Sequence, residues 1–141
     1  MSGSGRDEYQ EDLTDVIQDQ IDASASPGFT WGDSGNLTSG AWLLNDTVPS
    51  NKAGRRIFLQ NATLEAIFAA NENTATYDLS IYEHDGTTYT LITTVSIVAA
   101  RGGEFSVASL PLTTGKELAV QVTSGSCKNI TVGCVLKGTF T

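Results

Sequence analysis

The feature that most constrains the fold is an alternation of apolar and polar residues that begins after Gly28 and continues along the chain. Tyr77, Leu79 and Ile81 give its clearest form, because alternate residues of a strand point to the same face of a sheet. Such runs recur at a spacing of roughly 8–12 residues, which is typical of an antiparallel β-sandwich or jelly roll. We therefore expect an all-β domain with strands at 28–32, 41–45, 55–59, 62–70, 75–83, 88–99, 103–110, 116–123 and 129–140.

Groups of turn-forming residues separate the expected strands. Asp85 and Gly86 form the most specific group, because this pair favours the tight turn of a β-hairpin. The run 63–70 also suits a short helix, but its β neighbours favour a strand. After the Asp85-Gly86 turn, one face of the return strand is expected to carry Tyr89, Leu91, Val95 and Ile97. The other expected turns are 33–36, 49–51, 71–73, 101–103, 114–115 and 124–126.

The last expected hairpin turns at 124–126 and contains both cysteines of the chain. Cys134 shares the apolar face of the final strand, so we expect a core thiol there. Cys127 lies beside the turn and is expected to be the more exposed of the two. Two cysteines without a CxxC spacing or a nearby histidine indicate neither a disulfide scaffold nor a metal site. The apolar face of the final strand comprises Ile130, Val132, Cys134 and Leu136.

The charged residues, 17% of the chain, are few for a soluble protein, and they are unevenly placed. Residues 1–26 hold seven acidic side chains and one basic one, so most of the net charge of −8 lies in this segment. An acidic chain repels phosphate backbones, so we expect no nucleic-acid partner. No segment reaches the ~18–20 apolar residues of a membrane helix, and the first residues lack the pattern of a secretory signal. We therefore expect no membrane insertion, and synthesis in a cytosol.

The acidic segment carries a narrow apolar stripe at helical spacing, which predicts an α-helix from Tyr9 to about Ala23. Such a helix would be marginal alone, so it requires a surface to pack against. Three surfaces are open: a parallel bundle with copies of itself, a larger basic partner, or its own β domain. We expect an N-terminal arm, 1–27, that anchors or oligomerises a β domain, 28–141. The stripe comprises Tyr9, Leu13, Val16, Ile17 and Ile21.

The sequence contains no constellation typical of an enzyme. His84 is the only histidine, and its neighbours Glu83 and Asp85 point to the opposite face if the segment is a strand. The common nucleophile, metalloprotease and phosphate-loop motifs are missing from the sequence. We therefore expect a non-enzymatic protein, with no catalytic residues, no metal site and no cofactor.

Two groups of residues suggest binding. Trp31 and Trp42 could stack on sugar rings, although tryptophans of a small β domain more often fill its core. The only local cluster of basic residues could form charge contacts between subunits, or could be ordinary surface charge. This cluster comprises Lys52, Arg55 and Arg56.

Four stretches of the sequence resemble small structural proteins of tailed bacteriophages: 29–37, 42–51, 82–91 and 116–122. The resemblance covers roughly residues 28–138. It implies a non-enzymatic virion component, typically a homotrimer whose N-terminal segment anchors to the particle while the β domain projects outward. It transfers no catalytic residue to this chain.

These expectations combine into one leading function. The chain is expected to be a virion structural protein, either a capsid decoration protein or a head or neck fibre. Residues 1–27 would bind other virion proteins of the capsid, neck or tail. The alternative is a module for host attachment at a tail or fibre tip, which would bind a host surface glycan through Trp31 or Trp42.

Overall fold

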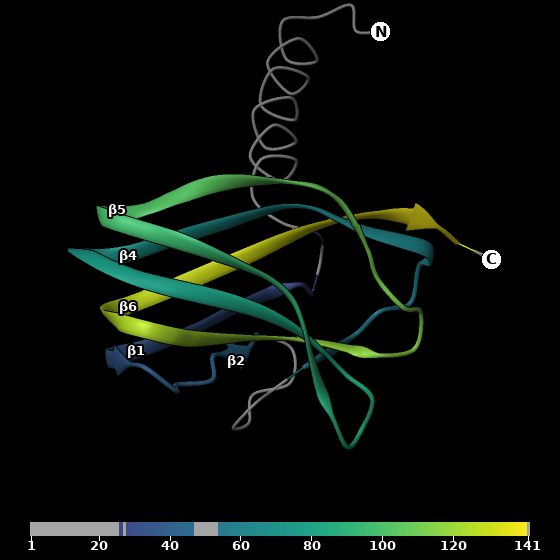
Figure 1. Ribbon diagram of the computed structural model, residues 1–141, viewed down its shortest axis with the longest axis horizontal. Helices are drawn as coiled ribbons and strands as arrows, with labels where there is room; N and C mark the ends of the chain where they lie inside the picture. Colours follow the sequence, from purple (N-terminus) through teal and green to yellow (C-terminus); the bar gives the residue numbers. More distant parts are fainter. Residues whose placement is uncertain (1–25, 27, 47–53, 141) are drawn as a thin grey trace, which may run out of the picture.

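The computed structural model describes residues 26, 28–46 and 54–140, and these residues form an all-β structure built on one antiparallel sheet (Figure 1). The order of its strands is β2-β1-β6-β4-β5, and β3 pairs with β6. The predicted fold class is confirmed as all-β with antiparallel strands. The predicted helix and its apolar stripe lie outside the described residues. The strands are β1 (Thr30–Thr38), β2 (Leu44–Asn45), β3 (Arg55–Arg56), β4 (Gln60–His84), β5 (Tyr89–Pro111) and β6 (Glu117–Thr139).

The strands β4, β5 and β6 are unusually long and bend back on themselves. They have 25, 23 and 23 residues, against about 3–10 for an ordinary strand. Each of them runs to the left edge of the view in Figure 1 and then returns. The pairing of β4 with both neighbours is interrupted after Ala70 and resumes with both at Tyr77, although the register shifts once more with β6 between Asp78 and Leu79 and with β5 between Ile81 and Tyr82. The three strands therefore bend at one level, and the sheet folds over along that line.

The predicted turns 71–73, 101–103 and 124–126 coincide with these bends: the chain reverses at each of them, but inside one long strand, so they are wrong as hairpin turns between separate strands. Gly102 and Gly125 have φ of +125° and +71°, a conformation that both turns and β-bulges favour. A Cβ on Gly102 would collide with the carbonyl oxygen of Ala69, and one on Gly125 with that of Thr76. The predicted turn 33–36 likewise lies inside β1, where the register shifts.

Both halves of the long strands contribute to one hydrophobic core. Leu64 and Ile67 of β4 precede the bend and Leu79 follows it, yet all three are fully buried in the same cluster. The ambiguous run 63–70 is part of β4, which confirms the strand interpretation. The predicted inward faces are also confirmed: Tyr77, Leu79 and Ile81 on β4, then Leu118, Val120 and Val122, and Ile130, Val132, Cys134 and Leu136 on β6.

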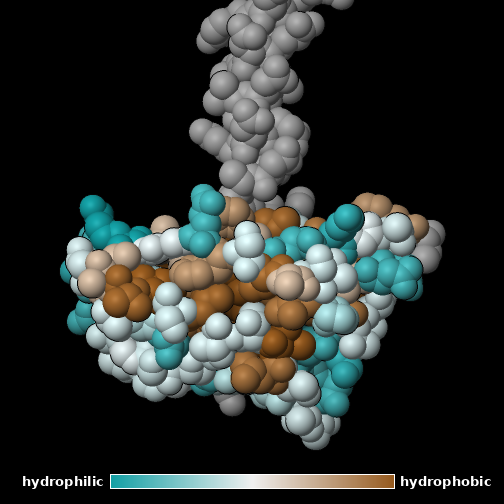
Figure 2. Space-filling view, turned by 45° about the horizontal axis from the view of Figure 1, so that its top comes forward, coloured by the Kyte–Doolittle hydropathy of each residue, from teal (hydrophilic) through white to brown (hydrophobic). Residues whose placement is uncertain are grey.

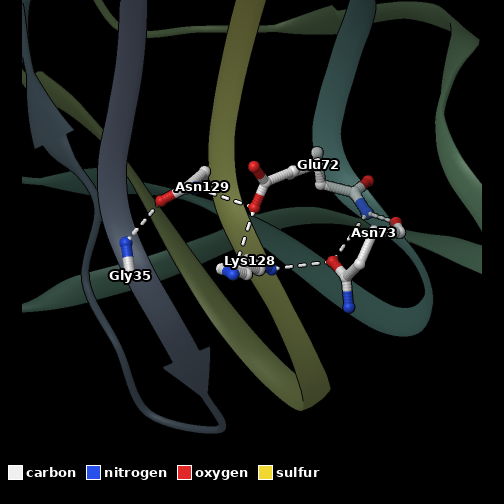
Figure 3. Close-up of polar contacts among 6 residues, drawn as sticks. Gly35, Glu72, Asn73, Lys128 and Asn129 are labelled. Atoms are coloured by element: carbon white, nitrogen blue, oxygen red, sulfur yellow. Dashed lines mark hydrogen bonds and ion pairs between the residues drawn. The ribbon is translucent and has the colours of Figure 1, made fainter.

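A network of polar side chains joins β1, β4 and β6 at the bend (Figure 3). The side-chain oxygen of Asn129 accepts the N–H of Gly35 at 2.6 Å, and its amide donates to Glu72 at 3.0 Å. Glu72 also pairs with the ammonium of Lys128 at 3.4 Å, and the backbone N–H of Lys128 donates to Asn73 at 3.0 Å. These contacts occupy polar groups that the interrupted ladder leaves without strand partners.

Both cysteines are buried. Cys134 is 0% exposed, as predicted for a core thiol, and burial raises its pKa to about 12. Cys127 was expected to be the more exposed, but it is only 2% exposed because it pairs with Leu37 of β1 instead of lying at a hairpin turn. Burial also raises the pKa of Cys127. Both thiols are therefore expected to be inert in the folded protein.

Alanine at the bend should destabilise the protein far more than alanine at a hairpin turn. Gly102→Ala combines a positive φ, at a cost of about 1 kcal/mol, with overpacking that typically costs another ~1–3 kcal/mol. Gly86→Ala is the matched control, since Gly86 also has a positive φ of +102° but open space around it. Chemical denaturation of both variants measures the difference. Equal losses of stability would show that the bend tolerates a side chain.

The thiols of Cys127 and Cys134 should not react in the native protein. At pH 8 both are protonated and shielded, because burial raises the pKa of each. We expect no reaction with a disulfide reagent in buffer and reaction of both cysteines in denaturant, as followed by absorbance. Reaction of one thiol without denaturant would show that β6 opens locally in the folded state.

Candidate binding surface

The hairpin between β4 and β5 positions the first residues of a candidate binding surface. The carboxylate of Asp85 accepts the backbone N–H groups of Thr88 at 2.8 Å and Thr87 at 2.9 Å, and these bonds lower the pKa of that carboxyl. The predicted tight hairpin is thus confirmed. Immediately before and after this turn, His84 and Tyr89 are paired across the two strands, and their rings stack with centroids 4.1 Å apart.

A bulge decides which face of β5 reaches this surface. Ile81 pairs with Thr93, but the next residue, Tyr82, pairs with Leu91, so β5 has one extra residue there. Because side chains alternate along a strand, one extra residue moves all the following ones to the other face. Tyr89 and Leu91 were predicted to share one face of the strand with Val95 and Ile97, which are buried. They instead lie on the outer face, and Leu91 is 55% exposed.

Trp42 completes a group of four rings, which we call the aromatic platform: Trp42, Tyr82, His84 and Tyr89. The Trp42 ring lies 4.5 Å from that of Tyr89 and 5.4 Å from that of Tyr82, between centroids. Backbone hydrogen bonds hold the Trp42 segment along β6, from Gly40 to Val122 at 2.7 Å and from Leu43 to Val120 at 2.9 Å. All four rings are partly exposed.

Polar groups surround the aromatic platform. Nδ1 of His84 lies 3.5 Å from a carboxylate oxygen of Glu117, and the side-chain amide of Gln121 donates to the Gly40 carbonyl at 3.2 Å. Partial burial, and then the charge of Glu117, raise the pKa of Tyr89. Partly exposed rings beside a carboxylate, an imidazole and an amide can stack on the C–H face of a sugar and bond its hydroxyls.

The two tryptophans have different places in the structure. Trp31 is 0% exposed in the core, where its ring lies 6.2 Å from that of Phe29. It has no surface to offer a sugar, so its candidate stacking role is wrong. Trp42 is the tryptophan that lies at the surface. Sequence reasoning did not associate it with Tyr82 or Tyr89, because only the pairing of both segments with β6 brings them together.

The acidic residue next to His84 lies on the other face of the strand. Glu83 is 6% exposed and accepts the backbone N–H of Thr113 at 2.6 Å, so it holds the β5–β6 connection.

Among residues 26, 28–46 and 54–140, no group of three or more His, Cys, Asp or Glu side chains is arranged to hold a metal ion. The same described residues include no helix long and apolar enough to cross a membrane.

The residues of the candidate basic cluster, Lys52, Arg55 and Arg56, do not share one environment. Lys52 lies outside the described residues. Arg56 donates to the Gly115 carbonyl at 2.9 Å and is exposed. Arg55 places its guanidinium carbon 5.8 Å from the centroid of Phe29 and 5.7 Å from that of Phe58. The two arginines therefore do not form one patch, and their contacts with another subunit stay a prediction.

Apolar surface also gathers on the side of the molecule seen in Figure 2. The first half of β4 and the second half of β5 form part of a shallow hollow of about 660 Å³. Phe68 and small residues such as Ala70 and Gly103 line it, with Arg101 and Glu104 also in its wall. Most of its lining residues are apolar or glycine, whereas the aromatic platform groups four rings beside polar side chains.

No protein-family model, curated protein or solved structure matches this chain. The arguments for its function therefore come from its own surfaces.

Proposed function

We propose that this protein is a non-enzymatic structural component of a tailed-bacteriophage virion, either a capsid decoration protein or a head or neck fibre. Its β domain is a sandwich, formed where the folded sheet encloses the core, and it stands as an exposed head. Residues 1–27 anchor this head to other virion proteins, and three copies associate. The shared core of both strand halves supports the sandwich.

The observation that carries this proposal is the separation of two surfaces. Ser26 is bonded to the second half of β6, through Cys134 at 3.0 Å and Leu136 at 2.8 Å. The aromatic platform is carried instead by the Trp42 segment and the β4–β5 hairpin, which both pair with the first half of β6, and the turn of this hairpin lies at the lower edge of Figure 1. An attachment point on one layer and an open surface on the other is the arrangement that an appended head requires.

Deletion of residues 1–25 should abolish incorporation into particles. The variant keeps Ser26 and its bonds to β6, so the β domain should retain its far-ultraviolet spectrum and cooperative unfolding. Copy number per purified particle, measured by quantitative mass spectrometry, decides the matter. Incorporation of the deleted form at normal occupancy would rule out the anchoring role.

The second candidate function is the binding of a host surface glycan, at a tail or fibre tip. The aromatic platform favours it, because the rings of Trp42 and Tyr89 lie 4.5 Å apart, tilted by 36°, on a surface that also carries Glu117 and Gln121. The two functions are compatible, since a virion head can also bind its host.

Trp42→Ala should weaken glycan binding about 5- to 150-fold, because an aromatic ring stacked on the sugar contributes on the order of 1–3 kcal/mol. Glycan-array binding followed by calorimetry provides the measurement. Val98→Ala is the control, since Val98 is 69% exposed on β5 and is not a member of the platform. This function would be contradicted if the native protein bound no host glycan, or if Trp42→Ala bound as tightly as the native protein.

A further inference from the structure

A second apolar surface lies beside Ser26, where the described domain joins residues 1–25. It is a groove of about 580 Å³ lined by Ser26, Phe58, Leu136, Lys137 and Phe140, among others. Phe58 and Phe140 are 43% and 79% exposed, and their rings stack with centroids 5.7 Å apart. We call these two residues the phenylalanine patch.

We propose that the phenylalanine patch is the contact between the β domains of neighbouring copies of this chain, packed around the axis of the homotrimer. This inference rests on the proposed function, in which residues 9–21 of the copies associate. It adds a second interface, made by the heads themselves, and names the residues that form it.

The position of Ser26 carries the first step of the argument. Its backbone N–H donates to Cys134 and its hydroxyl accepts the N–H of Leu136, so Ser26 is fixed against β6 at the edge of the groove. Packed helices lie about 8–10 Å apart, and the five residues from Ile21 to Ser26 span at most about 17 Å. Association of the apolar stripes therefore keeps every Ser26 near the axis and brings the adjoining patches of neighbouring copies within reach of one another.

The chemistry of the patch fits such a contact. Two stacked phenyl rings expose apolar surface to water, and burial against a neighbouring copy removes it. Aromatic residues are enriched in the centres of interfaces, where they contribute most of the binding energy. Phe58 also touches the core ring Phe29, at 6.0 Å between centroids, so the patch is continuous with the core.

The charges of the two segments are complementary. Three parallel arms bring together their acidic side chains, with Asp19 and Asp22 nearest to Ser26 in the sequence. Lys137 lines the groove and Arg55 lies over Phe58, so basic groups stand where these arms converge. Nε of Arg55 is buried and has no hydrogen-bond acceptor among the described residues. Gly28 permits this placement, because a Cβ there would lie 2.7 Å from that nitrogen.

A cross-linking experiment on the full chain tests the contact. Phe140→Cys introduces an exposed thiol into a protein whose own two cysteines are buried. A short bifunctional thiol reagent should join copies of Phe140→Cys about 100-fold faster than copies of the control Val98→Cys at micromolar protein, because assembled patches have millimolar effective concentrations. Val98 is the matched position, with 69% exposure on an exposed part of β5.

A dissociation experiment provides the second measurement. Phe140→Gln should raise the concentration at which the trimer dissociates about tenfold or more, as removal of a central aromatic side chain typically does. Val98→Gln should leave that concentration unchanged. Sedimentation equilibrium of both full-length variants measures this dissociation concentration. Because Phe140 is 79% exposed, its replacement should not unfold the β domain, so a weaker trimer would not reflect unfolding.

The outcomes separate this inference from the proposed function. An oligomer in which Phe140→Cys cross-links no faster than Val98→Cys would overturn the head contact and leave the virion role and the trimer intact. A monomer in which Phe140→Cys resists a bulky thiol reagent would mean that the chain's own arm covers the patch. A monomer with a reactive Phe140→Cys would leave the patch uncovered, and either monomer overturns the inference. The virion role is tested separately, by whether the variant lacking residues 1–25 is incorporated into particles.

Discussion

At Gly102 and Gly125 the missing side chain leaves room for a carbonyl oxygen of the neighbouring strand, that of Ala69 and Thr76 respectively. These close approaches let β5 and β6 bend at the same level as β4 without breaking the sheet. The bend brings both halves of each strand onto one core, and it separates the surface beside Ser26 from the aromatic platform. A side chain at either glycine would disturb all of these features together.

Local pattern predicted the β class, the Asp85-Gly86 hairpin and most inward faces, because alternation and tight turns are properties of adjacent residues. It did not predict the bends. Glycine with a positive φ suits a chain reversal and a bulge equally, and only pairing with distant strands decides between them. The burial of Cys127 has the same origin, since its partner Leu37 is distant in the sequence.

The candidate site was predictable only in part. Trp42 was recognised as an aromatic residue of interest, but its partners come from other segments, and the bulge opposite Tyr82 decides that Tyr89 faces outward. A single inserted residue thus moves Tyr89 and Leu91 to the face opposite Val95 and Ile97, with which alternation alone had grouped them. Trp31 illustrates the converse, since its neighbourhood in the sequence gives no sign that it is more buried than Trp42.

The position of β6 has a consequence for how the chain acquires its structure. It is the last strand in the sequence, yet it lies between β1 and β4 and also pairs with β3. The β4–β5 hairpin can form from its turn through contacts close in sequence, whereas β1, beyond its short pairing with β2, must wait for β6, which is synthesised long after it. We infer that the domain cannot complete its fold on the ribosome until residues 117–139 have emerged. The sheet therefore forms late in synthesis, in one cooperative step.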